Sequence, residues 1–572
     1  MLIPPAGTRP RRGVLAGWLA FLLPIAALVW IQLATGLWRW PSVGDQALME
    51  LGVLEASRGR QLLGLFSRFG WFHPGPAFFY LAAVPYVLLG RTYSAVALAT
   101  LALNALAAVA ATALLAHRAE SRPALWTWVA GLCCWALWLH PYSLFNPWPP
   151  LIPVLLLVVL LLLAAAIGSG SRSCIPWALL VASLIVQSHV ALVPVTVAIA
   201  AVTIAMATPA RDGAEAEPRP RRLVAALVWA ASFAVWIPPL LEQVVHSPGN
   251  LRRLAEFFTV PREHSLWTAL VWAATGGVTV PSWVLADSSA PADAAGGSST
   301  VAAVAAYAIQ LVALTAGWFI ARRRGRRFIA ALCGLCAAAM LTVWVSAWSI
   351  RGPLLRYLLV WSHAVGLAGA AAIAGAFTSR RAAPARPSAA ALVTVGAALA
   401  LAVAQDFALV AGHPRFPAAG QALPAPVRLA AVVPIAPAGQ RLIHAYMFSM
   451  PRDRPLALIE PVVAHLQVRG CRRPELHSDG LTGHPEAPWL IPWYLVELGK
   501  RFPEASGYAA LPHVRGAART APAAPDCLVL LLDTERAGVW QARGCLLIVD
   551  RGPGLSICVC PSAAAAYATP LG

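Results

Sequence analysis

The chain has 572 residues, of which 59% are hydrophobic and only 12% are charged, and its mean hydropathy is +0.67. A soluble domain is less apolar and carries about twice this share of charge, so the composition excludes an ordinary soluble protein. The formal net charge of +19 comes almost wholly from arginine. Many of these arginines lie in short segments between apolar runs, which is typical of cytoplasmic loops and does not indicate a nucleic-acid partner.

Apolar runs long enough to cross a bilayer recur through residues 1–412, which we interpret as the transmembrane domain. The sequence predicts a polytopic α-helical protein with about eleven spans, because that number places the arginine clusters in the cytoplasm. The N-terminus is then cytoplasmic and the C-terminus extracytoplasmic. The predicted spans are residues 14–37, 94–116, 124–140, 151–167, two short spans within 175–206, 223–237, 301–320, 328–348, 354–377 and 389–410. The two short spans are predicted to meet at an outer turn that contains the polar residues Gln187, Ser188 and His189.

Two apolar segments are not counted as spans. Residues 74–89 contain three prolines and are short for a crossing, so we expect a helix at the outer interface. If this segment crossed the membrane, the basic residues at 117–122 would lie outside. Residues 265–285 contain a glycine pair and Pro281, and a crossing there would place the arginines of 322–327 outside. We therefore expect an outer, partly embedded segment.

The composition changes after residue 412, where polar residues, proline and glycine alternate with short apolar stretches. Residues 413–572 are predicted to form an extracytoplasmic α/β domain, with strands at 528–533, 545–550 and 555–560 and a helix at 457–469. The cysteines of this part leave room for one or two disulfides. Cys333 and Cys336 have the spacing of a metal or redox pair, but they lie in an apolar helix without a second pair, so we predict no metal there.

The first predicted outer loop, residues 38–93, concentrates ionisable residues in a chain that has few of them. Charged groups beside a bilayer mark either a functional site or a water-facing loop. Asp45 comes at the start of a predicted helix over 46–56, where the helix dipole favours its ionised form. It suits a general base, although aspartate is also a common N-cap. Glu50 assists Asp45, binds the substrate whose hydroxyl gives up the proton (the acceptor), or is solvated.

Basic side chains suited to a phosphate occur in the same loop and near the last spans. The alternative for the arginines is pairing with lipid headgroups, and for the histidine a structural role. The candidates for donor phosphate binding are Arg58, Arg68, His73 and Arg356. The second predicted outer loop, residues 238–300, supplies polar candidates for contact with an acceptor, namely Glu242, Gln243 and Asn250.

Three segments carry a resemblance to a known group of enzymes: GDQALMELGVLEASRG at 44–59, FHPGPAFFYLAAVPYVLLG at 72–90 and the arginine-ended span that follows. The pattern resembles the GT-C glycosyltransferases, which include protein O-mannosyltransferases, aminoarabinose transferases of lipid A and actinobacterial arabinofuranosyl- and mannosyltransferases. The resemblance implies that Asp45 is the catalytic base. Many members have two adjacent acids, whereas Gln46 follows Asp45 here, so the second acid is absent or is Glu50.

The resemblance implies inverting or retaining transfer of a sugar from a polyprenyl-phosphate donor to a cell-envelope glycan, lipid or protein at the outer face of the cytoplasmic membrane. No nucleotide is needed, and no Walker or dinucleotide loop is present. The sequence requires no cofactor, although a divalent metal is possible. Two other classes stay open. A transporter or flippase predicts internal repeats and ionisable residues within spans, and a glycan-binding scaffold predicts that Asp45 is dispensable.

Overall fold

The computed structural model describes residues 45–65, 67, 71–89, 93–119, 121–136, 144–207, 219–246, 249–279, 298–352 and 354–378, together with residues 394, 397 and 401 and four strands beyond residue 473. The predicted span 14–37 and the predicted helix 457–469 lie outside these residues. So does the predicted span 389–410, apart from the three single residues.

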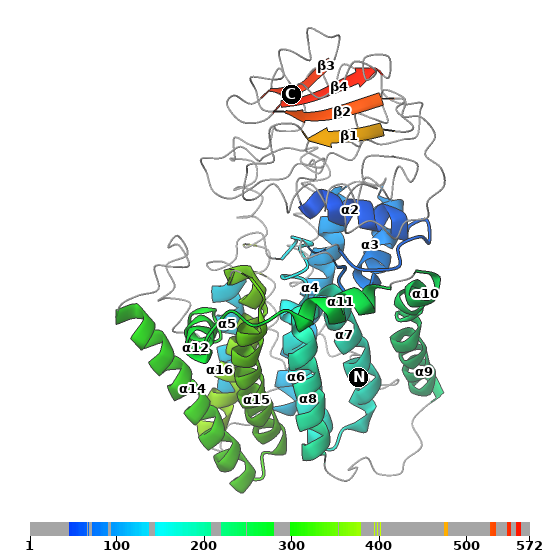
Figure 1. The fold of residues 1–572 in the computed structure, drawn as a ribbon. Coiled ribbons are helices and arrows are strands. Elements are labelled where there is room, and N and C mark those ends of the chain that lie inside the picture. Colours follow the sequence, from blue (N-terminus) through cyan, green and yellow to red (C-terminus); the bar gives the residue numbers. More distant parts are fainter. Residues whose placement is uncertain are drawn as a thin grey trace.

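A bundle of helices makes up most of the described chain, with shorter helices gathered at one end of it (Figure 1). The α-helices are α2 (Asp45–Ala56), α3 (Ala77–Leu88), α4 (Tyr93–Arg118), α5 (Arg122–Cys134), α6 (Pro153–Gly168), α7 (Ile175–Ser188), α8 (Val193–Met206), α9 (Arg219–Ala234), α10 (Ile237–Val245), α11 (Asn250–Thr259), α12 (Leu266–Thr275), α14 (Ser298–Arg323), α15 (Arg327–Ser349) and α16 (His363–Phe377). Short 3-10 helices are η2 (Arg172–Cys174), η3 (Val190–Leu192) and η5 (Arg356–Ser362).

The length and apolar composition of several helices fit a bilayer crossing, and the protein is a multi-pass α-helical membrane protein. Among the described residues, five stretches meet both requirements: Ser94–Arg118, Leu223–Val245, Thr300–Arg323, Arg327–Ser349 and Arg356–Phe377. The predicted runs at 94–116, 301–320 and 328–348 lie within these stretches, and the predicted run at 354–377 overlaps Arg356–Phe377. The predicted run at 223–237 is shorter than the structure shows, because α10 continues the apolar path of α9 to Val245 after a turn at 235–236.

Local sequence sets many of the helix ends. Proline occupies the first turn of α5, α6, α7, α8 and α10, where its missing N–H has no intrahelical partner to lose. Ser121 caps α5 by accepting from the backbone N–H of Ala124 at 3.3 Å. The predicted break within 175–206 is confirmed, because α7 ends at Ser188 and α8 begins at Val193. That each of the two helices crosses the membrane, with the turn outside, stays a prediction.

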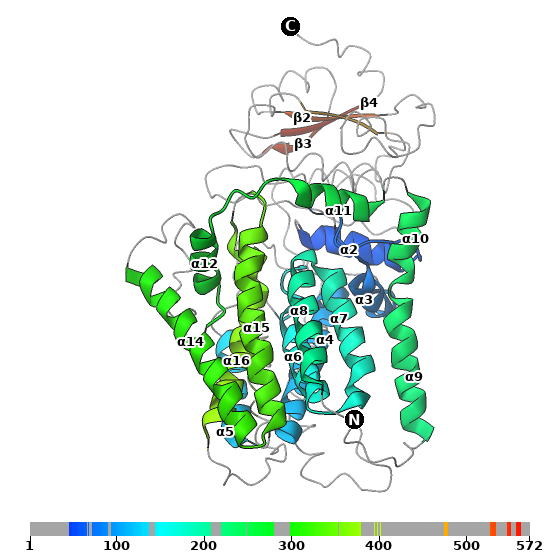
Figure 2. The ribbon, with the colours of Figure 1, turned by 60° about the horizontal axis from the view of Figure 1, so that its bottom comes forward.

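The centre of the bundle is α6, which is apolar on every side and buried along nearly its whole length. It packs against α4, α7, α8, α15 and α16. Figure 2 shows these helices around α6, while α9 and α14 lie at opposite edges of the bundle. In α2, Gly52 allows close packing on α3, because a Cβ there would lie 2.7 Å from Cζ of Phe79.

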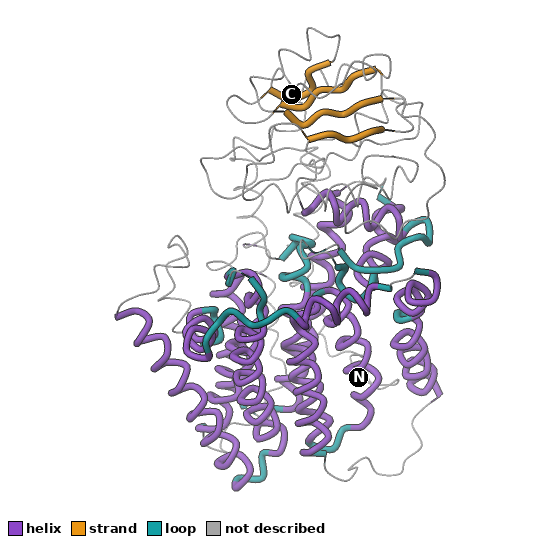
Figure 3. The backbone as a smooth tube through the Cα atoms, viewed as in Figure 1, coloured by secondary structure: helices purple, strands orange, loops and turns teal. Residues whose placement is uncertain are grey.

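The described strands form one mixed sheet with the order β1-β2-β4-β3, drawn beyond the end of the bundle that carries α2 (Figure 3). Strands β1 (Pro474–Ser478) and β2 (Cys527–Leu532) are parallel. Strand β4 (Ser556–Pro561) pairs antiparallel with both β2 and β3 (Leu546–Asp550), with an irregularity after Leu547. The three stretches predicted as strands are confirmed, and β1 was not predicted. The α/β domain as a unit stays a prediction.

The ten-residue helix α12 ends inside the bundle, within the segment that we expected to be partly embedded. Two backbone carbonyls just after its last residue are satisfied by side chains of other helices. Ser362 donates to the carbonyl of Gly276 at 2.9 Å, and Gln310, near the middle of α14, donates to the carbonyl of Val278 at 2.9 Å. Irregular backbone within an apolar bundle requires such partners. Gly277 makes the turn with a φ of +95°.

We expect Gly277→Ala to destabilise the protein by about 3 kcal/mol or more, because the residue has a left-handed backbone and no room for a Cβ. A Cβ there would lie 1.8 Å from Nε2 of His363. Gly325→Ala is the matched control, since Gly325 has a φ of +71° but no atom lies within 4 Å of the place that its Cβ would take. That change should cost only about 1 kcal/mol. Thermal unfolding of the full chain in detergent measures both, and equal losses would contradict the steric account.

Candidate functional site

The predicted catalytic carboxylates both fall on α2, at the end of the bundle that gathers the short helices α3, α10 and α11 (Figure 1). Asp45 is the first residue of α2, and Glu50 follows within the same helix. Their side chains lie outside the described part of the chain, so both roles stay predictions. Arg68 also lies outside the described residues.

Arg58 follows the end of α2 and forms an ion pair with Glu55, with 3.0 Å between Nη1 and Oε1. The Arg58 side chain is 45% exposed, so this pair contributes little to stability. Arg58 lies at the surface and Glu55 is only 17% exposed, and an incoming phosphate would compete with Glu55 for the guanidinium. The predicted role of Arg58 in phosphate binding is untested by this geometry.

The chain after α2 folds back on itself as a short antiparallel ladder. The N–H of Gly64 donates to the carbonyl of His73 at 3.0 Å, and the N–H of His73 donates to the carbonyl of Leu65 at 2.9 Å. Gly64 makes this close pairing possible, since a Cβ there would lie 2.7 Å from Cβ of His73. The ladder fixes the position of residues 71–73 ahead of α3.

His73 and His189 form a buried aromatic pair with ring centroids 4.6 Å apart. Each Nδ1 accepts from a backbone N–H at 3.3 Å, that of Val190 for His73 and that of Ala191 for His189. Both rings therefore carry their proton on Nε2 and are neutral. Burial lowers the pKa of His73 well below its usual value, with a further contribution from His189, and burial lowers the pKa of His189 to about 4.

Gln187 joins three separate parts of the chain beside this pair. Its Oε1 accepts from the N–H of Ala77, which starts α3, at 3.1 Å, and its Nε2 donates to the carbonyl of Val235 at 2.9 Å. Its backbone carbonyl accepts from the N–H of Gly75 at 3.3 Å. The polar turn at 187–189 is predicted from the sequence, but its hydrogen bonds to Gly75, Ala77 and Val235 are not.

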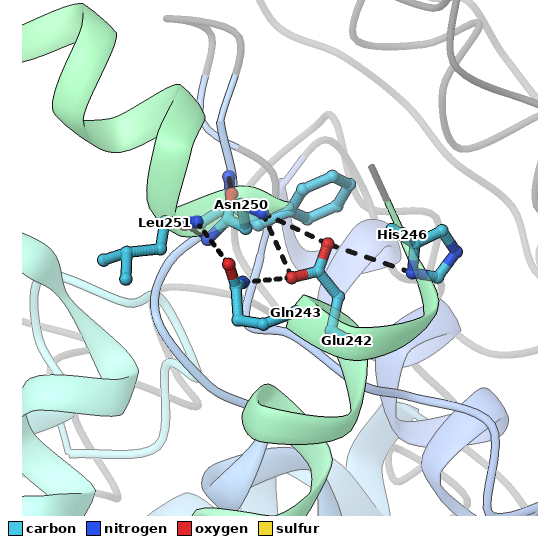
Figure 4. Close-up of polar contacts among 6 residues, drawn as sticks. Glu242, Gln243, His246, Asn250 and Leu251 are labelled. Carbon is cyan, nitrogen blue, oxygen red and sulfur yellow. Dashed lines mark hydrogen bonds and ion pairs between the residues drawn. The ribbon is translucent and has the colours of Figure 1, made fainter. Parts of the chain in front are cut away.

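The acceptor candidates of the second polar segment lie together at the junction of α10 and α11 (Figure 4). Glu242 is buried and accepts from the N–H of Asn250 at 3.2 and 3.1 Å. It also accepts from the side chain of Gln243, and His246 lies 3.9 Å away. Gln243 in turn accepts from the N–H of Leu251 at 3.3 Å. Glu242 and Gln243 thus satisfy free N–H groups at the start of α11.

Asn250 connects this junction to the first loop through two reciprocal hydrogen bonds. Its Oδ1 accepts from the N–H of Phe72 at 2.8 Å, and its Nδ2 donates to the carbonyl of Phe72 at 2.9 Å. An aromatic contact between Trp71 and Phe257 lies beside it, with centroids 5.7 Å apart. The structure therefore brings His73, Glu242, Gln243 and Asn250 together. Their proposed contacts with donor or acceptor stay predictions.

Arg356 occupies a different part of the same end of the bundle. It is exposed and starts η5, which leads into α16. The next residue, Tyr357, packs against Trp148 with ring centroids 5.0 Å apart. No group of three His, Cys, Asp or Glu residues able to hold a metal ion occurs among the residues that the structure describes.

Comparison with known proteins gives one structural similarity. No protein-family model matches the chain, and no curated protein sequence matches it. Among solved structures, the crystal structure of ArnT from Cupriavidus metallidurans in the apo state matches with a TM-score of 0.46 and 11% sequence identity. The match covers 96% of this chain and 99% of that chain.

The histidine pair predicts a loss of stability in acid. The unfolded chain binds protons on these residues near pH 6.5 and the folded chain does so only at lower pH, so stability is complete above 6.5 and declines as the pH falls toward 4. For His189 the expected decrease in the free energy of unfolding is about 2 kcal/mol at pH 5. Thermal unfolding between pH 8 and 5 should therefore show a smaller pH effect in His189→Asn than in wild type. Parallel curves would contradict this assignment.

The reciprocal bonds of Asn250 predict that Asn250→Asp destabilises the protein by about 2–3 kcal/mol at neutral pH. The substitution replaces the donor to the carbonyl of Phe72 with an acceptor and places a second carboxylate next to Glu242. Asn146→Asp is the matched control, because among the described residues Asn146 only accepts, from the N–H of Trp148 at 3.1 Å. Chemical or thermal unfolding in detergent compares the two, and equal effects would show that the donated bond is unimportant.

Proposed function

We propose that this protein is a GT-C-type glycosyltransferase that transfers a sugar from a polyprenyl-phosphate donor to a cell-envelope acceptor. The observation that carries the proposal is the position of α2. A helix beginning with Asp45 lies at the end of a membrane bundle where two polar loops are fastened together. Lipid-borne and water-borne substrates meet at such a boundary.

In the proposed reaction, Asp45 accepts the proton of the acceptor hydroxyl. The oxygen of that hydroxyl attacks the anomeric carbon of the sugar at the same time. The bond between that carbon and the phosphate oxygen breaks, and polyprenyl phosphate leaves. The start of a helix favours the ionised carboxylate that a base requires. The cleaved phosphate ester supplies the driving force.

The remaining predicted residues take supporting roles in this proposal. Arg58, Arg68 and Arg356 hold the donor phosphate as charged donors, and His73 contributes as a neutral ring. Glu242, Gln243 and Asn250 shape the acceptor side, and Glu50 supports Asp45. The α2 end of the bundle faces outward from the cytoplasmic membrane, with residues 413–572 on the same side. The resemblance of residues 44–59 and 72–90 to GT-C enzymes supports these assignments.

Asp45→Asn should lower the transfer rate about a hundredfold or more, because the amide cannot accept the proton. The assay uses membranes that contain the full chain and labelled polyprenyl-phosphate arabinose or mannose. The control is Glu256→Gln, which removes an exposed carboxylate of α11 that pairs with Arg252 at 2.8 Å. Wild-type transfer by the Asp45→Asn protein would refute the proposed base, and a transporter or a scaffold would then account better for the chain.

A further inference from the structure

The last turn of α11 and the segment that connects it to α12 contact the C-terminal end of α15 and the residues just after it at three points. Arg351 donates from Nη2 to the carbonyl of Phe258 at 3.2 Å. The guanidinium of Arg262 lies 3.6 Å from the ring centroid of Trp348. Nε2 of His264 is 2.7 Å from the carbonyl oxygen of Gly352. Two guanidinium groups are thereby held at one end of α15.

Arg351 is an unusual buried cation. Its residue is only 8% exposed, its Nη1 donates to the carbonyl of Ser349 at 2.8 Å, and its buried Nε has no hydrogen-bond partner in the described structure. Burial, and then the positive charge of Arg262, lower the pKa of Arg351, whereas the exposed Glu263 raises it. Within the described chain, neither arginine has a carboxylate within ion-pair distance. The pair therefore carries an excess positive charge.

An exposed apolar surface lies directly beside this charge. Leu341, Val345 and Trp348 follow one face of α15 at spacings of four and three residues, and Leu341 and Val345 are 45% and 50% exposed. At the start of α12, Leu266 and Trp267 are also exposed. Trp344 donates from Nε1 to the carbonyl of Leu266 at 2.9 Å, which holds the two exposed surfaces next to each other.

We propose that this surface binds an anionic membrane phospholipid. The phosphate of the headgroup lies against the exposed guanidinium of Arg262, and the buried charge of Arg351 adds to the attraction, while the acyl chains follow Leu341, Val345 and Trp267. An anionic lipid fits better than a zwitterionic one, because it brings no ammonium group to two unpaired guanidinium groups. The site uses none of the residues assigned to the donor phosphate and does not depend on the proposed transfer reaction.

The test uses the full chain in nanodiscs of phosphatidylcholine with increasing fractions of phosphatidylglycerol. Native mass spectrometry measures the phosphatidylglycerol retained on release from the disc. Arg262→Gln should weaken retention about fivefold, as expected for one arginine at a lipid surface. Trp348→Leu, which removes the ring beneath Arg262, should weaken it in the same direction. Arg252→Gln is the control, because Arg252 is exposed on α11 but already paired with Glu256.

Three results would overturn the proposal. Equal retention by wild type and Arg262→Gln would show that the arginine pair does not hold the headgroup. Displacement of phosphatidylglycerol by inorganic phosphate alone would identify a site for free phosphate. If polyprenyl phosphate displaced the bound phosphatidylglycerol, and added phosphatidylglycerol did not displace bound polyprenyl phosphate, the surface would be assigned to the donor carrier. Retention that falls for both tested variants and not for Arg252→Gln supports the lipid site.

Discussion

The reciprocal pair between Asn250 and the backbone of Phe72 joins the two polar segments of this protein. One side chain satisfies both the donor and the acceptor of one peptide residue, with distances of 2.8 and 2.9 Å, as a neighbouring β-strand would do. The pair is buried, so water cannot replace a lost hydrogen bond, and breaking either bond would destabilise the fold. Glu242 holds Asn250 from the other side, and the position of the first loop relative to α11 follows from this arrangement.

A second set of polar contacts provides hydrogen-bond donors for backbone carbonyls inside the bundle. The helix α12 ends among apolar helices, and the carbonyls of Gly276 and Val278, just after its last residue, would be costly to leave without donors. Ser362 and Gln310 supply those donors from η5 and α14. Gln187 accepts from the N–H of Ala77 at the start of α3 and donates to the carbonyl of Val235, just after α9. Isolated polar residues in apolar runs here mark places where the backbone leaves regular structure.

The sequence predicts the helices well, because apolar length and arginine position are strong signals in a membrane protein. It also predicts the break at 187–189 and three of the strands. It cannot predict that Asn250 contacts Phe72, since 178 residues separate them and neither lies in a recognisable motif. It likewise misses the continuation of α9 into α10, because Pro238 and Pro239 are typical of a loop, although here they occupy the first turn of a helix.

The buried histidines limit how charge is distributed at this end of the molecule. His73 and His189 use Nδ1 to accept backbone N–H groups, and burial holds both rings neutral at physiological pH. A neutral imidazole can donate one hydrogen bond to a phosphate but cannot balance its charge. Arginines such as Arg58, Arg262, Arg351 and Arg356 must therefore provide the positive potential there. Because the guanidinium of arginine stays charged at any physiological pH, the proposed binding of an anionic lipid and of a donor phosphate should outlast acidification that disturbs the histidine pair.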